Sequence, residues 1–327
     1  MQILIVGGGG LVGNGVAELL AKEGRLAGTL VTELVLADRS PPKRAVAGTF
    51  PIRFAECDVR DSAQVAAAFS NSPDLVFHLA AVMSGPAERD YALGWQINVD
   101  GTRNVLEACR SLKRPPRLVF TSSSAVYGEG LPDPVPDDYP PRPRNAYGTQ
   151  KAVCELMVVE YSRRGFIDGR VGRLAGVALR PDDTHQGAAA FVTSIVREPL
   201  SGRDVVCPVP HTTRMGIITP RTAFASLLHL AALPEDAIRE HRITQIPALA
   251  VTVGEIIEGV RRVGGAEAVA HIRLDIDPEL VTIRKGIASA FSADRARALG
   301  FPVVTNIDAV IAEFLLDSGM RLPAAPR

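Results

Sequence analysis

The sequence predicts an α/β protein: a doubly wound parallel sheet followed by a smaller C-terminal lobe. Short runs of Val, Ile and Leu alternate with amphipathic stretches over the first third of the chain. A run of glycines follows the first apolar run, and the alternation ends after Arg180-Pro181. Strands as apolar as these are typical of parallel sheets, because helices cover both faces of such a sheet.

The alternation places the expected elements in order. We expect strands at residues 2–6, 33–37, 52–55, 75–78, 117–121 and 169–174. We expect helices at residues 11–23, 62–70, 91–111 and 147–164, and in the lobe at 223–232, 253–263 and 307–316. The segment 130–145 is dense in Pro and Asp and is expected to be a loop.

Composition excludes several classes of protein. The 327 residues carry 36 basic and 36 acidic side chains, so we expect neither a nucleic-acid nor a membrane-surface partner. The four cysteines lie far apart, without CxxC or zinc-ligand spacing, which indicates reduced, buried thiols and no metal site. No apolar run approaches the roughly 18–20 residues of a membrane span. A cytoplasmic protein is the expectation.

A glycine-rich turn follows the first expected strand and reads Gly7-Gly8-Gly9-Gly10-Leu11-Val12-Gly13. Such a turn lets the backbone approach a pyrophosphate, and the helix that follows presents free N–H groups and its positive dipole end. Two glycine spacings fit a dinucleotide-binding turn: Gly7-x-x-Gly10-x-x-Gly13 and Gly8-x-Gly10-x-x-Gly13. An isolated match to such a pattern can also be a plain flexible turn. In this context the turn predicts a Rossmann-type nucleotide-binding fold.

The ends of the next strands favour NAD as the nucleotide. Asp38 ends the second strand, where a carboxylate binds both adenosine ribose hydroxyls and repels a 2′-phosphate. Arg39 beside it argues the other way, because a cation accommodates that phosphate. Further along, Asp58 and Val59 are expected near the adenine, and Leu79, Ala80 and Ala81 along the cofactor. His78 is more often a hydrogen-bonded structural residue at such a position than a catalyst. We therefore expect residues 1–175 to bind NAD, with segments of 217–250 returning to them, and residues 176–327 to form mainly the substrate lobe.

A candidate catalytic group lies in the second half of the nucleotide domain. Tyr147 and Lys151 are one helical turn apart and share a helix face. A nearby ammonium favours the phenolate, which would bring a phenol pKa of about 10 toward neutrality. The pattern alone also fits a surface Tyr and Lys. What makes it specific is the hydroxyl cluster of residues 121–124 at the end of the fifth strand, which can orient a substrate oxygen beside Tyr147.

These motifs resemble the extended short-chain dehydrogenase/reductases, the NAD-dependent epimerase/dehydratase superfamily. The resemblance is carried by residues 7–13, Asp58-Val59, residues 78–81, residues 98–104, Ser122-Ser123 ahead of Val126-Tyr127-Gly128, and Tyr147 with Lys151. It implies that Ser123 is the active hydroxyl, with Ser122 and Ser124 in support, and that Asn98 holds the helix geometry behind the active site. It also assigns Asn98, Thr121, Leu174, Tyr147 and Lys151 to the cofactor site, and Ser84, Ser123, Ser124, Tyr147 and Ala175 to the substrate site.

A closer resemblance, over nearly the whole chain, is to the D-erythronate dehydrogenase-like subgroup. It is carried by residues 77–82, 84–85, 148–152, 161–166, 168–169, 197–200, 207–210, 251–255 and 296–301. It implies NAD-dependent oxidation of the secondary alcohol next to the carboxylate of a small sugar acid. It also implies a homodimer formed by the helices at 98–111 and 147–164. The chain departs from the subgroup at Ala175-Gly176, at 180–185 and at 215–218, all where the lobe meets the nicotinamide.

Other readings stay open at this point. A nucleotide-sugar epimerase or dehydratase with tightly bound NAD is the main alternative, although Gly176 stands where such enzymes commonly have Asn. A non-catalytic NAD sensor would have no reason to keep Ser123, Tyr147 and Lys151. For the carboxylate of a small acid the sequence offers Arg214, whose guanidinium matches it bidentately. Arg173 and the His185 loop are rivals, and a surface arginine is the plain alternative.

Overall fold

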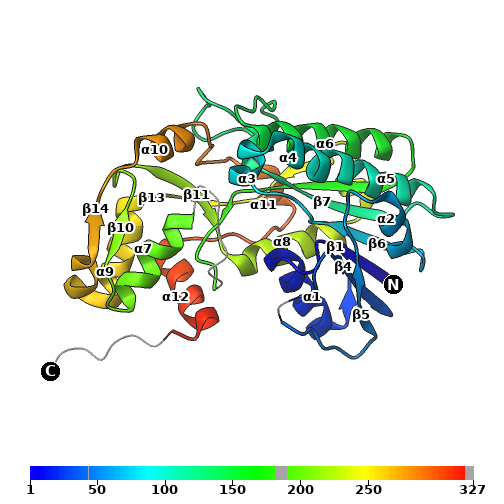
Figure 1. Ribbon diagram of the computed structural model, residues 1–327, viewed down its shortest axis with the longest axis horizontal. Coiled ribbons are helices and arrows are strands. Elements are labelled where there is room, and N and C mark those ends of the chain that lie inside the picture. The colour runs from blue at the N-terminus through cyan, green and yellow to red at the C-terminus, as the bar shows by residue number, and fades with distance from the viewer. Residues whose placement is uncertain (43, 182–189, 321–327) are drawn as a thin grey trace.

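The computed structural model describes residues 1–42, 44–181 and 190–320, and its larger part is built on a seven-stranded parallel sheet (Figure 1). Side by side, the strands are β12 (Ile243–Gln245), β8 (Asp168–Leu174), β7 (Arg117–Ser123), β6 (Leu75–His78), β1 (Gln2–Val6), β4 (Glu33–Asp38) and β5 (Ile52–Glu56). Every neighbouring pair is parallel. The sheet grows from β1 toward β5 on one side and toward β12 on the other. The predicted fold class is confirmed.

The register brings the carboxyl ends of the strands to one edge. Val6 is the partner of both Ala37 and His78, and His78 is the partner of Phe120. The residues that follow, including Gly7 and Thr121, therefore meet where the strand order reverses between β1 and β6. Ligands of doubly wound sheets bind at this point.

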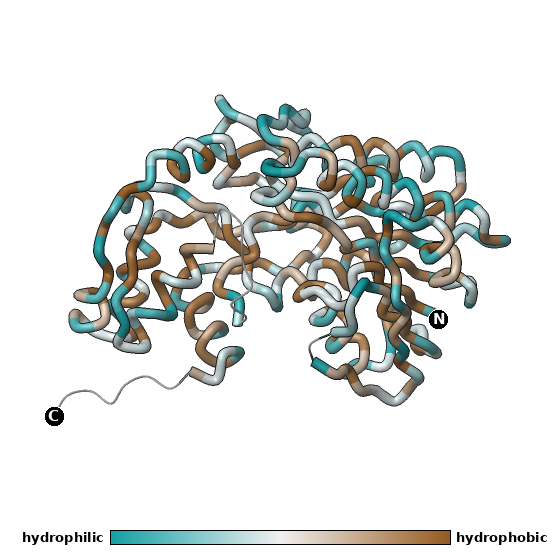
Figure 2. Tube along the Cα trace, in the orientation of Figure 1, coloured by the Kyte–Doolittle hydropathy of each residue, from teal (hydrophilic) through white to brown (hydrophobic). Residues whose placement is uncertain are grey.

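Helices cover both faces of the sheet, as Figure 1 shows. On one face α1 (Leu11–Glu23) packs on α8 (Pro220–Ala232), and Leu20, Phe77 and Leu227 share a buried core there. The other face carries α2 (Ser62–Ala68), α3 (Ser84–Arg89), α4 (Tyr91–Trp95), α5 (Gly101–Arg110) and α6 (Ala146–Arg163). Hydrophobic residues concentrate inside each part and hydrophilic ones on the outer turns (Figure 2).

The single long helix expected at residues 91–111 is interrupted by a π-helical turn, Gln96–Asp100, between α4 and α5. A π turn spreads the backbone hydrogen bonds by one residue and is often found at functional sites. Here it frees the Asn98 carbonyl, which accepts from the Thr102 hydroxyl at 2.5 Å and from the Cys154 thiol at 3.1 Å. The turn is thus tied to its own helix and to α6.

The second part is formed mainly by the last half of the chain. Its strands are β9 (Gly176–Val177), β11 (Arg214–Ile218) and β13 (Leu249–Thr252) in one small sheet, and β10 (Val205–Cys207) and β14 (Ile272–Leu274) in another. Its helices are α7 (Ala190–Leu200), α9 (Val253–Ala270), α10 (Pro278–Lys285) and α12 (Ile307–Ser318), whereas α11 (Asp294–Ala298) contacts β12 of the large sheet. A hairpin of β2 (Arg25–Leu26) and β3 (Thr29–Leu30) and two 3-10 turns, Ser124–Val126 and Glu235–Ala237, complete the described elements.

Two elements of residues 217–250, α8 and β12, lie against the large sheet and not in the lobe. α9 extends past its expected end at residue 263, and its left-handed Gly265 (φ 75°) marks a kink. The chain departs from the subgroup at residues 180–185. Of these, residues 182–185, and so His185, lie outside the part of the chain that the structure describes. Within the described part of the chain, no helix combines the length and apolar character needed to cross a membrane.

Candidate active site

The glycine turn is built for close backbone contact. Gly7 has a φ of 94°, and a side chain there would lie 2.5 Å from the Ala80 backbone nitrogen. A side chain at Gly13 would collide with the carbonyl oxygen of Gly7. A side chain at Gly8 would in turn lie 2.8 Å from the Leu36 side chain, so both glycine spacings agree with the packing. At Gly10 the nearest protein atom would be 3.5 Å away, so the chain's own packing tolerates a side chain there. The free space at Gly10 lies beside the start of α1, which has no side-chain cap.

A cavity of about 170 Å³ lies between this turn and the ends of β4 and β6. It is lined by Gly7, Gly10, Ala37, Asp38, Arg39, Cys57, Asp58, Val59, Leu79, Ala80, Ala81, Val82 and Ile97. The predicted cofactor residues outside this set are Leu11, Val12 and Gly13 on α1 and Asn98, Thr121, Tyr147, Lys151 and Leu174. The cavity therefore brings together residues that follow four strands, β1, β4, β5 and β6, and that were predicted from the sequence to bind the cofactor.

Two carboxylates in this cavity are held in place. Asp38 accepts hydrogen bonds from the backbone N–H of Gly9 at 3.0 Å and of Arg39 at 2.7 Å, one on each oxygen. Both oxygens keep a second lone pair for a ribose hydroxyl. Asp58 is paired with Arg60 at 2.6 Å, and this hydrogen bond lowers the pKa of the Asp58 carboxyl. The Arg39 side chain is exposed.

The catalytic candidates come from β7 and α6. Asn145 caps α6 by accepting from the Gly148 N–H at 2.7 Å, and a side chain at Gly148 would collide with the Ala125 carbonyl. The first turn of α6 is thereby pressed onto the segment after Ser123. The Ser123 hydroxyl lies close enough to the Tyr147 phenol to lower the pKa of that phenol. The three predicted groups therefore converge at the edge of the sheet: Ser123, Tyr147 and, one turn on, Lys151.

The Lys151 ammonium donates to the Thr121 carbonyl at 2.8 Å and lies 5.7 Å from the centre of the Tyr147 ring. Burial raises the pKa of Tyr147 to about 12, against the smaller opposite effect of the Ser123 hydroxyl. Burial also lowers the pKa of Lys151 to about 8. Loss of water around the phenolate is the largest cause of the raised Tyr147 pKa, and Lys151 is not among the causes of this shift. That Lys151 brings the Tyr147 pKa down in the working enzyme stays a prediction.

The Asn98 side chain forms hydrogen bonds with the backbone of the segment behind the site. Its side chain accepts from the Val82 N–H at 2.8 Å and donates to the Val82 carbonyl at 3.1 Å. It also donates to the Gln150 side chain at 2.7 Å. Since Val82 lines the cavity and Gln150 precedes Lys151, Asn98 couples the cofactor loop to α6. Sequence reasoning missed Gln150, and no pattern distinguishes it from a surface glutamine.

A buried ionic network was also missed. The Arg173 guanidinium donates to both carboxylate oxygens of Glu155, at 2.8 and 2.7 Å, and to the Tyr127 hydroxyl at 2.9 Å. The Ser122 hydroxyl donates to the same carboxylate at 2.5 Å. The only available signal was the position of Glu155 four residues after Lys151, on the same helix face. Because Arg173 is fully engaged, it does not suit the role of substrate anchor that it shared with Arg214.

The predicted substrate residues lie in different surroundings. Ala175 is buried after β8, Ser124 is buried in the turn after Ser123, and Ser84 is half-buried at the start of α3. Arg214 begins β11 with 45% of its side chain exposed and forms an ion pair with Asp133. It is therefore a partly solvated cation that already has a partner.

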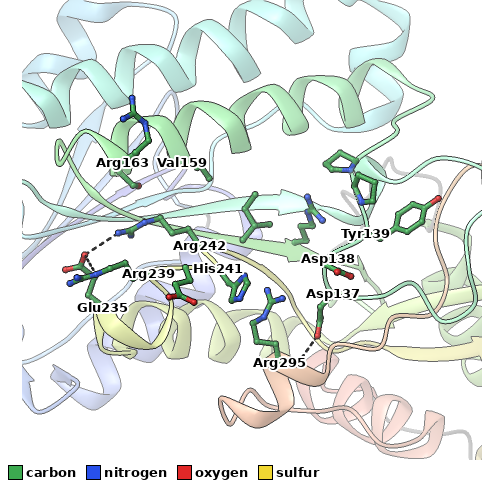
Figure 3. Close-up of a pocket in the computed structure, with 16 residues that line it drawn as sticks. Asp137, Asp138, Tyr139, Val159, Arg163, Glu235, Arg239, His241, Arg242 and Arg295 are labelled. Carbon is green, nitrogen blue, oxygen red and sulfur yellow. Dashed lines mark hydrogen bonds and ion pairs between the residues drawn. The ribbon is translucent and has the colours of Figure 1, made fainter.

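A larger cavity, about 730 Å³, lies at the β12 edge of the sheet (Figure 3). Charged side chains from α6, α11, the loop at 137–141 and residues 239–243 line it. Arg242 is neutralised locally by its pair with Glu235 at 3.2 Å, and the Asp137 carboxylate accepts from the backbone N–H of Arg295 at 2.9 Å. Of the candidate site residues, Arg173 lines this cavity, whereas Ser123, Tyr147 and Lys151 do not. Size therefore does not identify the active site here.

The chain is similar to known dehydrogenases and to a solved structure described as an epimerase. The chain is 38% identical to a D-erythronate dehydrogenase from Cupriavidus necator over 98% of this chain and 99% of that one. It is 35% identical to one from Haemophilus influenzae over 96% and 99%. A crystal structure described as a nucleoside-diphosphate-sugar epimerase from Agrobacterium tumefaciens superposes with a TM-score of 0.92 at 38% identity, covering 97% of this chain and 94% of that one.

The model of the NAD dependent epimerase/dehydratase family matches residues 3–215, which include the glycine turn, Ser123, Tyr147 and Lys151. Because this model matches more than half of the chain and a relative aligns over nearly its full length, the chain belongs to the NAD dependent epimerase/dehydratase family.

Proposed function

We propose that this protein is an NAD-dependent dehydrogenase that oxidises the secondary alcohol next to the carboxylate of a small sugar acid such as D-erythronate. One observation carries the proposal: Ser123, Tyr147 and Lys151 meet at the sheet edge that also carries the glycine turn and Asp38. The D-erythronate dehydrogenases that align over almost the whole chain support the choice of substrate class.

In this proposal the glycine turn, with Gly13, Leu11 and Val12 at the start of α1, holds the pyrophosphate, and Asp38 binds the ribose. When bound, NAD would supply the hydride acceptor and the positive charge of its oxidised nicotinamide ring. Tyr147 accepts the proton of the substrate hydroxyl, and Ser123 binds the same oxygen. Lys151 binds the nicotinamide ribose. With its pKa raised to about 12 in the chain alone, Tyr147 is protonated until cationic groups surround it.

The alternative is a nucleotide-sugar epimerase or dehydratase, which the description of the Agrobacterium structure favours. Gly176 argues against it, because this residue has no side chain with which to bind a sugar-nucleotide diphosphate. A screen of four- to six-carbon aldonates and uronates with NAD separates the two. Net NADH formation from an acid supports the dehydrogenase. Conversion of a nucleotide sugar without net NADH would instead support the epimerase or dehydratase.

We also propose a cytoplasmic homodimer in which α5 and α6 pack against their symmetry mates. Of the apolar residues that could face a partner, Val105 is fully buried within its own chain and is excluded. Leu156 on α6 is 69% exposed, and Ala152 and Val159 beside it are half-buried. An apolar side chain as exposed as Leu156 is suited to an interface. Light scattering at micromolar concentration tests this, and a monomer there would contradict it.

A further inference from the structure

Arg284, at the end of α10, is a buried cation that has no counter-ion among the described residues. The buried cationic side chains of the described residues are Lys151, Arg170, Arg173 and Arg284. Lys151 donates to a carbonyl, Arg170 pairs with Asp168 at 2.7 Å, and Arg173 pairs with Glu155. Arg284 is only 8% exposed, and its Nε has no hydrogen-bond partner. Among the described side chains, none of the carboxylates forms an ion pair with it.

An unpaired buried charge is costly for a folded protein. Removing a guanidinium from water is compensated only when anions or acceptors replace that water. Burial alone lowers the pKa of Arg284 to about 10, so the side chain is still charged at neutral pH. The free chain therefore carries an unfavourable interaction that an anionic ligand would relieve. Such stored unfavourable interactions are typical of binding sites, where function is kept at the expense of stability.

The position of Arg284 relates it to the active site. The chain that follows α10 returns to the segment just after Ser123: Phe291 stacks on Tyr127 with ring centres 5.9 Å apart, and Val135 donates to the Ala290 carbonyl at 2.9 Å. A side chain at Gly286 would lie 3.9 Å from the Glu129 carboxylate. The segment that directly follows Arg284 thus lies against the segment that follows Ser123.

We infer that Arg284, and not Arg214, binds the carboxylate of the acid substrate. This inference rests on the proposed function and adds the residue that selects an acid. A guanidinium matches a carboxylate with two parallel hydrogen bonds, and the match is strongest where water is excluded. Arg214 is partly solvated and paired with Asp133, so a carboxylate bound there would have to displace that partner. Arg284 has no partner to displace.

Arg284→Met tests the inference, with Arg214→Met and Arg284→Lys as comparison variants. We expect Arg284→Met to raise KM for the acid substrate at least about 30-fold and to leave the dissociation constant of NADH unchanged. Arg284→Lys should recover part of that loss, because it restores the charge but not the fork of donors. Arg214→Met should change KM less than about threefold.

Thermal unfolding gives a second readout that does not need turnover. Without substrate, Arg284→Met should unfold at a temperature equal to or above that of the wild type, because it removes an unpaired buried charge. A residue with only a structural role would lower this temperature when removed. D-Erythronate with NADH should raise the unfolding temperature of the wild type and of Arg214→Met, but not of Arg284→Met.

The outcomes are distinguishable. If the wild type oxidises an acid and Arg284→Met keeps its KM, the inference is wrong and the proposed function stands. If Arg214→Met shows the large effect instead, the anchor is Arg214. If only a nucleotide sugar stabilises the wild type and Arg284→Met abolishes that effect, the anion is a diphosphate. In that case both the carboxylate assignment and the proposed function fail.

Discussion

Replacing Arg173 by Met removes the cation of the buried network between β8, α6 and β7. Glu155 is 1% exposed, so the variant leaves a carboxylate in the protein interior without a counter-ion. Breaking a buried pair in this way costs about 3–5 kcal/mol. Loss of the hydrogen bond to the buried Tyr127 hydroxyl adds about 1 kcal/mol. Since small proteins have about 5–15 kcal/mol of stability in total, we expect a large fall in the free energy of unfolding.

Urea unfolding followed by circular dichroism measures this loss. Arg221→Met is the matched control: Arg221 is 59% exposed in its pair with Asp317, and removing it should cost less than about 1 kcal/mol. The double variant Glu155→Leu/Arg173→Met should recover about 2 kcal/mol relative to Arg173→Met, because no charge is left buried. If the two single losses simply add in the double variant, the residues are not coupled and the reasoning fails.

Three further substitutions test other parts of the account. Tyr147→Phe should lower kcat by about 10²–10⁴-fold without weakening NAD binding, and a variant that keeps a tenth of the wild-type rate would show that Tyr147 is not the base. Asp38→Ser should narrow the preference for NAD over NADP in kcat/KM, whereas a wild type that prefers NADP would refute the assignment of Asp38. Burial lowers the pKa of His78 from 6.5 to about 3, so its contribution to stability is present above pH 6.5 and is lost as the pH falls from 6.5 toward 3. Between pH 7 and pH 5 the wild type should lose about 2 kcal/mol more than His78→Gln in urea unfolding, and equal losses would contradict a neutral buried imidazole.

The large sheet was predictable because its signal is local. A strand buried on both faces must be apolar along its whole length, so residues 2–6 and 75–78 were predicted with the bounds that the structure has. The α1 helix begins after glycines and ends at the left-handed Gly24, and both are local signals as well. Motifs with fixed spacing likewise indicated the family, which the comparisons confirm.

What the sequence did not predict depends on contacts between distant segments. Glu155 and Arg173 look like surface residues until α6 is placed against β8, where each becomes the other's partner. Nothing local distinguishes the exposed Arg214 from the buried Arg284, because their difference is one of solvent access. The raised pKa of Tyr147 was not predicted for the same reason, because its largest cause is burial, which is a tertiary property.

The most direct test of the central claim is NADH formation by the purified protein with D-erythronate and NAD. The account predicts that absorbance of NADH rises until many equivalents have formed per protein chain, and that Tyr147→Phe abolishes the rise. No NADH with any small sugar acid, together with conversion of a nucleotide sugar at constant NAD, would contradict it.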